Sequence, residues 1–159
     1  VPLEKWRKVV ETNVTGCFLM SLAAGATMIG DKRGGSIVNI ASIAGRIGYA
    51  LRTPYAASKW GMIGLSHSLA AELGPYGVRC NAVLPGPVRG ERFDRVVAER
   101  AAAEVKSIEE TERWYMKDMP LARLVTPEEV ATAVTFLASD DAASITGQAL
   151  NVDSGYRMQ

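Results

Sequence analysis

The sequence contains little cysteine and almost no histidine: Cys17, Cys80 and His67 are the only residues of these two types. There is no C-x-x-C pair and no cluster of histidines, so neither a zinc-type metal site nor a disulfide framework is expected. Both cysteines lie in apolar stretches, which predicts buried free thiols in a reducing compartment. His67 has no partner at a metal-binding spacing, and we expect an ordinary histidine that is exposed or partly buried.

An excess of charge of one sign is also lacking, because 18 basic and 17 acidic residues give a net charge of +1. Nucleic-acid-binding proteins usually carry a strong basic bias, so no nucleic-acid partner is expected. No apolar run approaches the roughly 18 residues of a membrane span, and the first residues, VPLEKWRKVV, lack a signal-peptide pattern. These observations predict a soluble, cytoplasmic protein without a membrane partner.

Segments with helical and with strand periodicity alternate along the 159 residues. The expected helices cover residues 2–28, 53–73, 91–118 and 126–138, and the expected strands cover residues 36–41, 78–85 and 148–153. A strand, a helix and a strand of these lengths form a βαβ unit with a right-handed crossover. The pattern therefore predicts an α/β fold with a parallel sheet.

Three side chains between positions 42 and 59 make chemical sense together. Tyr55 and Lys59 are four residues apart in an expected helix, so they share one face. An ammonium group close to a phenol favours loss of the phenol proton, which predicts a general acid or base. Ser42 follows a strand where the chain enters a loop, and its hydroxyl could hold a substrate oxygen against the phenol. Asn13 lies inside the first helix, where asparagine is unfavourable, and is either functional or an ordinary exposed residue.

The second strand ends in a rigid turn that contains Pro85, Gly86 and Val88. Carboxyl ends of parallel strands meet at one edge of a sheet, so this turn and Ser42 are expected to face one crevice. The charged segment 91–118 follows, and its large apolar side chains either contact substrate or belong to the core. These side chains are Phe93, Trp114, Tyr115 and Met116.

Five motifs occur in a fixed order along the chain. They are Ser42, the YAASK segment at 55–59, NAVLPGPV at 81–88, ITGQ at 145–148 and NVDSG at 151–155. Together they closely resemble the short-chain dehydrogenase/reductase family over nearly the whole sequence. The resemblance implies the last three strands of a Rossmann-type, doubly wound parallel sheet with flanking helices. It also implies an NAD- or NADP-dependent oxidoreductase (EC 1.1.1.-) that interconverts a secondary alcohol and a ketone, as 3-oxoacyl and small-ketone reductases do.

The resemblance further implies a role for each matched residue. Tyr55 is the catalytic acid or base, and Lys59 eases loss of its proton and binds the nicotinamide ribose. Ser42 orients the substrate oxygen, and Asn13 holds a water in the proton relay. The residues implied to lie against the nicotinamide ring are Pro85, Gly86 and Val88.

One part of the family pattern does not occur in this sequence. The family begins with a strand and a Thr-Gly-x-x-x-Gly-x-Gly turn that binds the pyrophosphate, followed by the residues that select NAD or NADP. We therefore expect residues 1–159 to be the C-terminal catalytic part of a single domain, with the strand at 36–41 as an exposed edge. The alternative is a non-catalytic fragment that self-associates and cannot bind a dinucleotide alone.

Two of the expected helices, residues 3–28 and 54–73, are apolar and rich in small side chains. They match the helices through which the family commonly dimerises. A homo-oligomer is therefore expected.

Overall fold

Three parallel strands form the centre of the computed structural model, which describes residues 1–157. Strands β1 (Gly35–Ile40), β2 (Val78–Pro85) and β3 (Ala149–Val152) are hydrogen-bonded in the order β1-β2-β3. Ile37 pairs with Cys80, and Val83 pairs with Leu150. This sheet confirms the predicted α/β fold with the last strands of a Rossmann-type arrangement.

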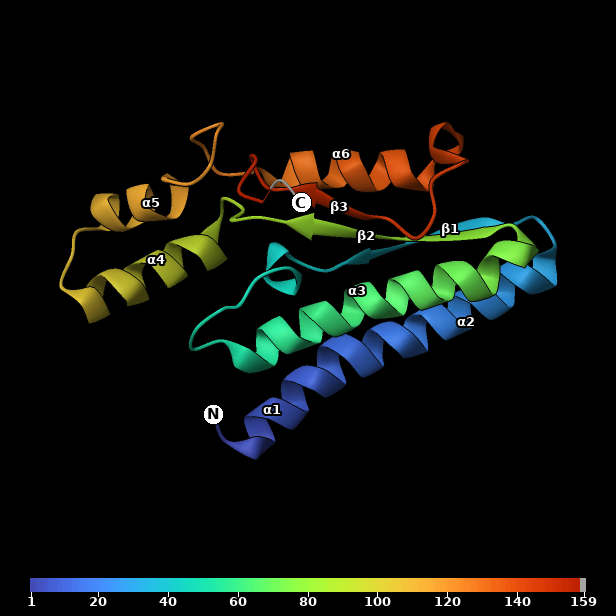
Figure 1. Ribbon diagram of the computed structural model, residues 1–159, viewed down its shortest axis with the longest axis horizontal. Helices are drawn as coiled ribbons and strands as arrows, with labels where there is room; N and C mark the ends of the chain where they lie inside the picture. Colours follow the sequence, from blue (N-terminus) through green and yellow to red (C-terminus); the bar gives the residue numbers. More distant parts are fainter. Residues whose placement is uncertain (158–159) are drawn as a thin grey trace.

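Helices cover both faces of the sheet (Figure 1). Helices α1 (Leu3–Val10), α2 (Gly16–Asp31) and α3 (Thr53–Leu73) lie on one face, and α6 (Pro127–Ala138) lies on the other. Helices α4 (Glu91–Glu104) and α5 (Ile108–Met116) extend beyond the carboxyl end of β2. Short 3-10 turns cover Ile43–Gly45, Gly74–Tyr76 and Asp140–Ala142.

The central strand β2 is buried on both faces, which explains its almost continuous apolar sequence. Towards α3, its Val78 and Cys80 pack with Ile37 and Leu69. Towards α6, its Val83 packs with Leu137. The two small cores hold the sheet between its helical layers.

Strand β1 forms an edge of the sheet. In the part of the chain that the structure describes, no strand pairs with its outer side. Ile40, at its carboxyl end, retains 43% exposure. The expected exposed edge is present in the structure, and edges of this kind normally find a partner or a cover.

The expected long N-terminal helix is present, and its helices α1 and α2 are joined without a break by a π-helical turn over Glu11–Thr15. The helix Leu3–Asp31 is long and apolar enough to span a membrane by length and composition alone, because it has an 18-residue window of mean hydropathy 1.3. Its apolar residues are spread among glycine, alanine and serine rather than forming one run. Only 11% of that window is buried, and the core helix of a soluble protein and a signal sequence meet the same criteria.

The segment 91–118 forms two helices instead of the single expected helix. Val105 takes a left-handed conformation (φ 53°), and Ser107 then starts α5 through a capping box with Glu110. Phe93 is 7% exposed and packs with Val97, and Tyr115 lies edge-on to its ring at 5.4 Å. Of the two alternatives for Phe93, the structure favours the core.

Several single residues outside the site can be compared with the sequence predictions, and of the two thiols predicted to be buried only Cys80 is fully so. Thr126 and Glu129 form a capping box at the start of α6. Cys17 and Cys80 are free thiols, half-buried and buried respectively, and burial raises the pKa of Cys80 to about 11. His67 is exposed on α3.

Candidate active site

Ser42 lies just beyond the carboxyl end of β1 and starts the 3-10 turn Ile43–Gly45. Its hydroxyl oxygen accepts a hydrogen bond from the Ala44 N–H at 3.2 Å, which fixes the side chain at the start of the loop. Gly45 allows this loop to pack directly on α3, because a Cβ there would lie 2.8 Å from the carbonyl oxygen of Lys59. The close contact ties the Ser42 loop to the helix that carries the other two candidate residues.

Tyr55 and Lys59 lie in the first turns of α3, one above the other, as their spacing predicts. The Lys59 Nζ is 5.8 Å from the centroid of the Tyr55 ring and donates a hydrogen bond to the Ile40 carbonyl at 2.9 Å. Burial lowers the pKa of Lys59, and the nearby charge of Arg92 lowers it further. The ammonium is therefore held between the tyrosine and the end of β1.

Asn13 lies in the π-helical turn and points towards α3. Its Nδ2 donates to the Ser58 Oγ at 2.9 Å, and the Ser58 hydroxyl donates to the Tyr55 carbonyl at 2.8 Å. Ser58 is only 1% exposed, so this polar chain crosses the contact between the two helices. This hydrogen bond explains why an asparagine stands in the middle of a helix. π-Helical turns often occur at functional sites.

The turn after β2 is fixed on both sides. The Gly86 N–H donates to the Val152 carbonyl at 2.9 Å, and Val88 forms a parallel bridge with Val125. A Cβ on Gly86 would lie 2.9 Å from the Cα and Cβ atoms of Asp153, so a larger residue would displace the turn. Pro85, Gly86 and Val88 are thus held at the carboxyl edge, next to the strand end that carries Ser42.

The candidate residues share one edge of the sheet, but they are not joined by side-chain hydrogen bonds. Within residues 1–157, the hydroxyl groups of Ser42 and Tyr55 and the ammonium of Lys59 form no hydrogen bond with one another. Each therefore retains capacity for a ligand. No group of three potential metal ligands is found among the described residues.

Two residues near this edge of the sheet were not predicted from the sequence. Ser58 belongs to the YAASK motif, but nothing in the pattern distinguished it from an ordinary helix residue. Arg92 lies on α4, with its guanidinium carbon 5.9 Å from the Tyr55 ring centroid. Its approach to Tyr55 depends on the direction of α4 after the turn, which sequence periodicity does not define.

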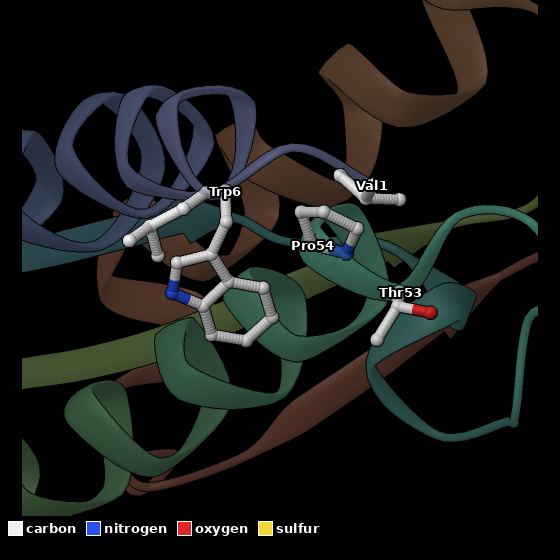
Figure 2. A pocket seen from close by; sticks show the side chains of 5 residues that line it. Val1, Trp6, Thr53 and Pro54 are labelled. Carbon is white, nitrogen blue, oxygen red and sulfur yellow. The ribbon is translucent and has the colours of Figure 1, made fainter.

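A shallow apolar pocket of about 410 Å³ lies beside this site rather than within it. Figure 2 shows Val1 and Trp6 from the N-terminal segment facing Thr53 and Pro54 at the start of α3. Neither Ser42, Tyr55 nor Lys59 lines it. The pocket belongs to the exposed face formed by α1 and α3.

Fold and site together define an α/β protein with a Tyr-x-x-x-Lys pair at the carboxyl edge of a parallel sheet. The family model described as Enoyl-(Acyl carrier protein) reductase matches residues 1–157. The chain belongs to the short-chain dehydrogenase/reductase family.

Individual relatives agree with this assignment. The chain is 39% identical to the (3R)-3-hydroxyacyl-CoA dehydrogenase of Canis lupus familiaris, over 98% of this chain and 56% of the relative. It is 38% identical to the L-rhamnose 1-dehydrogenase (NAD(P)(+)) of Azotobacter vinelandii, over 98% of this chain and 57% of that protein. The structure of sorbitol-6-phosphate 2-dehydrogenase from Erwinia amylovora matches with a TM-score of 0.96 and 32% identity, covering 100% of this chain and 62% of its own. The chain thus spans a little over half the length of these relatives, and it matches their C-terminal part.

Proposed function

We propose that this chain forms the proton-transferring part of an NAD(P)-dependent oxidoreductase that interconverts a secondary alcohol and a ketone. The observation that carries the proposal is the shared position of Ser42, Tyr55 and Lys59 at the carboxyl edge, with Lys59 over the Tyr55 ring. The relatives with dehydrogenase names support the same class of reaction. By analogy with 3-oxoacyl and small-ketone reductases, the substrate is a small-molecule ketone or alcohol.

In the proposed reaction, the Ser42 hydroxyl donates a hydrogen bond to the carbonyl oxygen of the ketone. The Tyr55 phenol gives a proton to that oxygen as the ketone becomes an alcohol, and takes it back in the reverse direction. Lys59 stabilises the phenolate that remains, because an ammonium near a phenolate lowers its free energy. Asn13 connects the site to solvent through the contact between α2 and α3.

The residues at the carboxyl edge fit the nicotinamide end of a dinucleotide. Bound NAD(P)H would supply the hydride. Lys59 has an ammonium proton left to bind a ribose hydroxyl, since its acceptors within residues 1–157 are the Ile40 carbonyl and the Met62 sulfur. Gly86 lets the turn pack directly against Asp153, and Pro85 and Val88 offer apolar surface for the ring. These residues would hold the nicotinamide end of either NAD or NADP.

A chimera tests the proposal. The segment of the canine relative that precedes its matched part is joined to Val1, and folding is checked by circular dichroism. The chimera is then assayed with NADH and NADPH on a panel of ketones. Removing a general acid costs about 10²- to 10⁴-fold in rate, so Tyr55→Phe should lower kcat by this factor while the matched control Tyr76→Phe should not. Equal turnover by the chimera and its Tyr55→Phe variant would show that the tyrosine has another role.

A second candidate function is non-catalytic self-association of this chain. It is favoured by the exposed apolar residues on α1 and α2, among them Trp6, Phe18 and Leu22, which are 37%, 42% and 55% exposed. The pocket beside Trp6 provides a recess on the same face (Figure 2). We infer that a second copy covers this face through helices α1 to α3, whichever function holds.

Sedimentation equilibrium separates these possibilities. Leu22→Glu should shift the chain towards monomer, whereas Leu121→Glu, an exposed leucine in the loop before α6, should leave association unchanged. Calorimetry with NADH and NADPH completes the test. Association without dinucleotide binding at millimolar concentration supports the non-catalytic alternative for this chain alone, and micromolar affinity excludes it.

A further inference from the structure

Arg92 is a positive charge without a partner next to the candidate catalytic tyrosine. Its guanidinium carbon is 5.9 Å from the centroid of the Tyr55 ring, at nearly the same distance as the Lys59 ammonium. In residues 1–157 it forms no hydrogen bond and no ion pair, and its side chain is exposed. Tyr55 therefore has two neighbouring cations instead of one.

Nothing on α4 neutralises this charge. Glu91 and Asp94 flank Arg92 in the sequence, but residues one or two positions apart do not face each other on a helix. The positions three and four residues on, which share its face, are Arg95 and Val96.

Among the described residues, the groups that shift the pKa of Lys59 in addition to burial are Arg92 and Cys17, and neither is a carboxylate. A site with two cations, one of them partly buried, and no acid has an excess of positive charge that an anionic ligand would balance.

We propose that Arg92 determines substrate specificity by binding an anionic group, a carboxylate, attached a few bonds from the reacting carbonyl. The phenol oxygen is one bond outside the Tyr55 ring and the guanidinium carbon is 5.9 Å from the centroid of that ring, so both groups lie within the reach of one small ligand. The planar guanidinium binds a carboxylate through two parallel hydrogen bonds. The substrate class is therefore a short oxo acid, or a hydroxy acid in the reverse direction.

This specificity rests on the proposed oxidoreductase function and leaves its chemistry unchanged. The carbonyl carbon accepts a hydride from NAD(P)H, and its oxygen accepts a proton from Tyr55. The carboxylate keeps its charge throughout and serves only for recognition.

The first test measures binding to the chain itself, so it does not depend on turnover. Acetoacetate is titrated at millimolar concentration while chemical shifts of the Tyr55 ring are followed by NMR. Its methyl ester serves as the neutral probe, and inorganic pyrophosphate serves as the probe for a cofactor phosphate. A charge-assisted hydrogen bond is worth enough that Arg92→Gln should weaken acetoacetate binding at least about tenfold.

The control is Arg95→Gln, which removes an exposed arginine one turn further along the same helix and should leave the affinity unchanged. Arg92→Lys keeps the charge without the paired hydrogen bonds and should give an intermediate loss. Four results would overturn the inference: no saturable shift with acetoacetate, equal binding of the ester, an equal loss in Arg95→Gln, or a dependence on Arg92 that appears for pyrophosphate only.

The second test uses the chimera and separates this inference from the proposed function. Arg92→Gln should lower kcat/KM for acetoacetate at least about tenfold relative to that for the methyl ester, with KM for the dinucleotide unchanged. Turnover of both ketones at an unaltered ratio would retain the oxidoreductase and remove Arg92 as its specificity residue.

Discussion

Replacing Gly45 by alanine tests whether close packing of the Ser42 loop on α3 holds the site together. The new Cβ would lie 2.8 Å from the Lys59 carbonyl oxygen and 2.9 Å from its carbon, where ordinary contacts begin at 3.4 Å. The Ile63 Cδ1 atom, 2.6 Å away, can move with its side chain, but the Lys59 atoms belong to the helix backbone, so the loop must move by about 0.6 Å. Overpacking of this kind costs about 1–3 kcal/mol.

Gly48 provides a matched control in the same loop. A Cβ at Gly48 meets no atom within 4 Å, and neither glycine has a positive φ. Both substitutions reduce the freedom of the unfolded chain, which stabilises by about 0.4–1 kcal/mol. Gly48→Ala should therefore be neutral or slightly stabilising, and Gly45→Ala should be less stable than Gly48→Ala by about 1–3 kcal/mol.

Urea unfolding followed by tryptophan fluorescence measures this difference, provided that the slope of the transition is unchanged. In the chimera, Gly45→Ala should also lower kcat more than Gly48→Ala does, because Ser42 lies three residues before the displaced contact. If the two variants agree within about 0.5 kcal/mol, the loop is not held by this contact and the reasoning is refuted.

Three further predictions concern single groups elsewhere. In a double-mutant cycle of Asn13→Ala and Ser58→Ala, the unfolding free energies should show a coupling of about 0.5–3 kcal/mol, and additivity would contradict the 2.9 Å hydrogen bond. Hydrogen bonds from Arg123 and from the Thr126 N–H lower the pKa of Glu129 to about 2. Because this pKa lies below that of the unfolded chain, the ionised carboxylate stabilises the folded protein at higher pH. The wild-type chain should therefore melt at a higher temperature than Glu129→Gln at neutral pH, and this advantage should be lost as the pH falls from about 4.5 to about 2. A difference in melting temperature that does not change with pH would argue against the ion pair. Cys80 should resist iodoacetamide at pH 8 until urea unfolds the chain, because burial raises its pKa to about 11, whereas rapid labelling of the folded protein would place it at the surface.

The strands and the main helices were predictable because their local signals agree with their burial. The apolar run 78–85 became the fully covered strand Val78–Pro85, and helix α3 begins at Thr53 as expected. Helix α6 begins at Pro127, next to the expected start at residue 126, and Thr126 and Glu129 cap it. In each case the local sequence pattern favours the same secondary structure that packing against the neighbouring helices and strands favours.

The division of the segment 91–118 was missed although a signal was present. Ser107-Ile-Glu-Glu110 has the same capping-box pattern as Thr126 to Glu129. Charged residues on both sides of the break made the segment look like one solvated helix. The left-handed conformation of Val105 has no sequence signal, because β-branched residues rarely adopt it.

The predicted site residues were identified through their motifs, but their contacts were not. Sequence spacing places Lys59 next to Tyr55, yet it cannot show that the ammonium binds the Ile40 carbonyl. Nor can it show that a π-helical turn brings Asn13 to Ser58. These contacts join segments far apart in sequence, and local patterns carry no information about them.

The position of Lys59 is linked to the free edge of the sheet. The Ala41 N–H donates to the Val83 carbonyl of β2, and backbone groups alternate in direction along a strand. The Ile40 carbonyl therefore points away from β2, towards the outer edge, where it accepts the Lys59 hydrogen bond. A carbonyl has two lone pairs, so a strand that pairs with this edge need not displace the lysine. It would instead fix the direction of the carbonyl, and with it the distance between the ammonium and the Tyr55 ring.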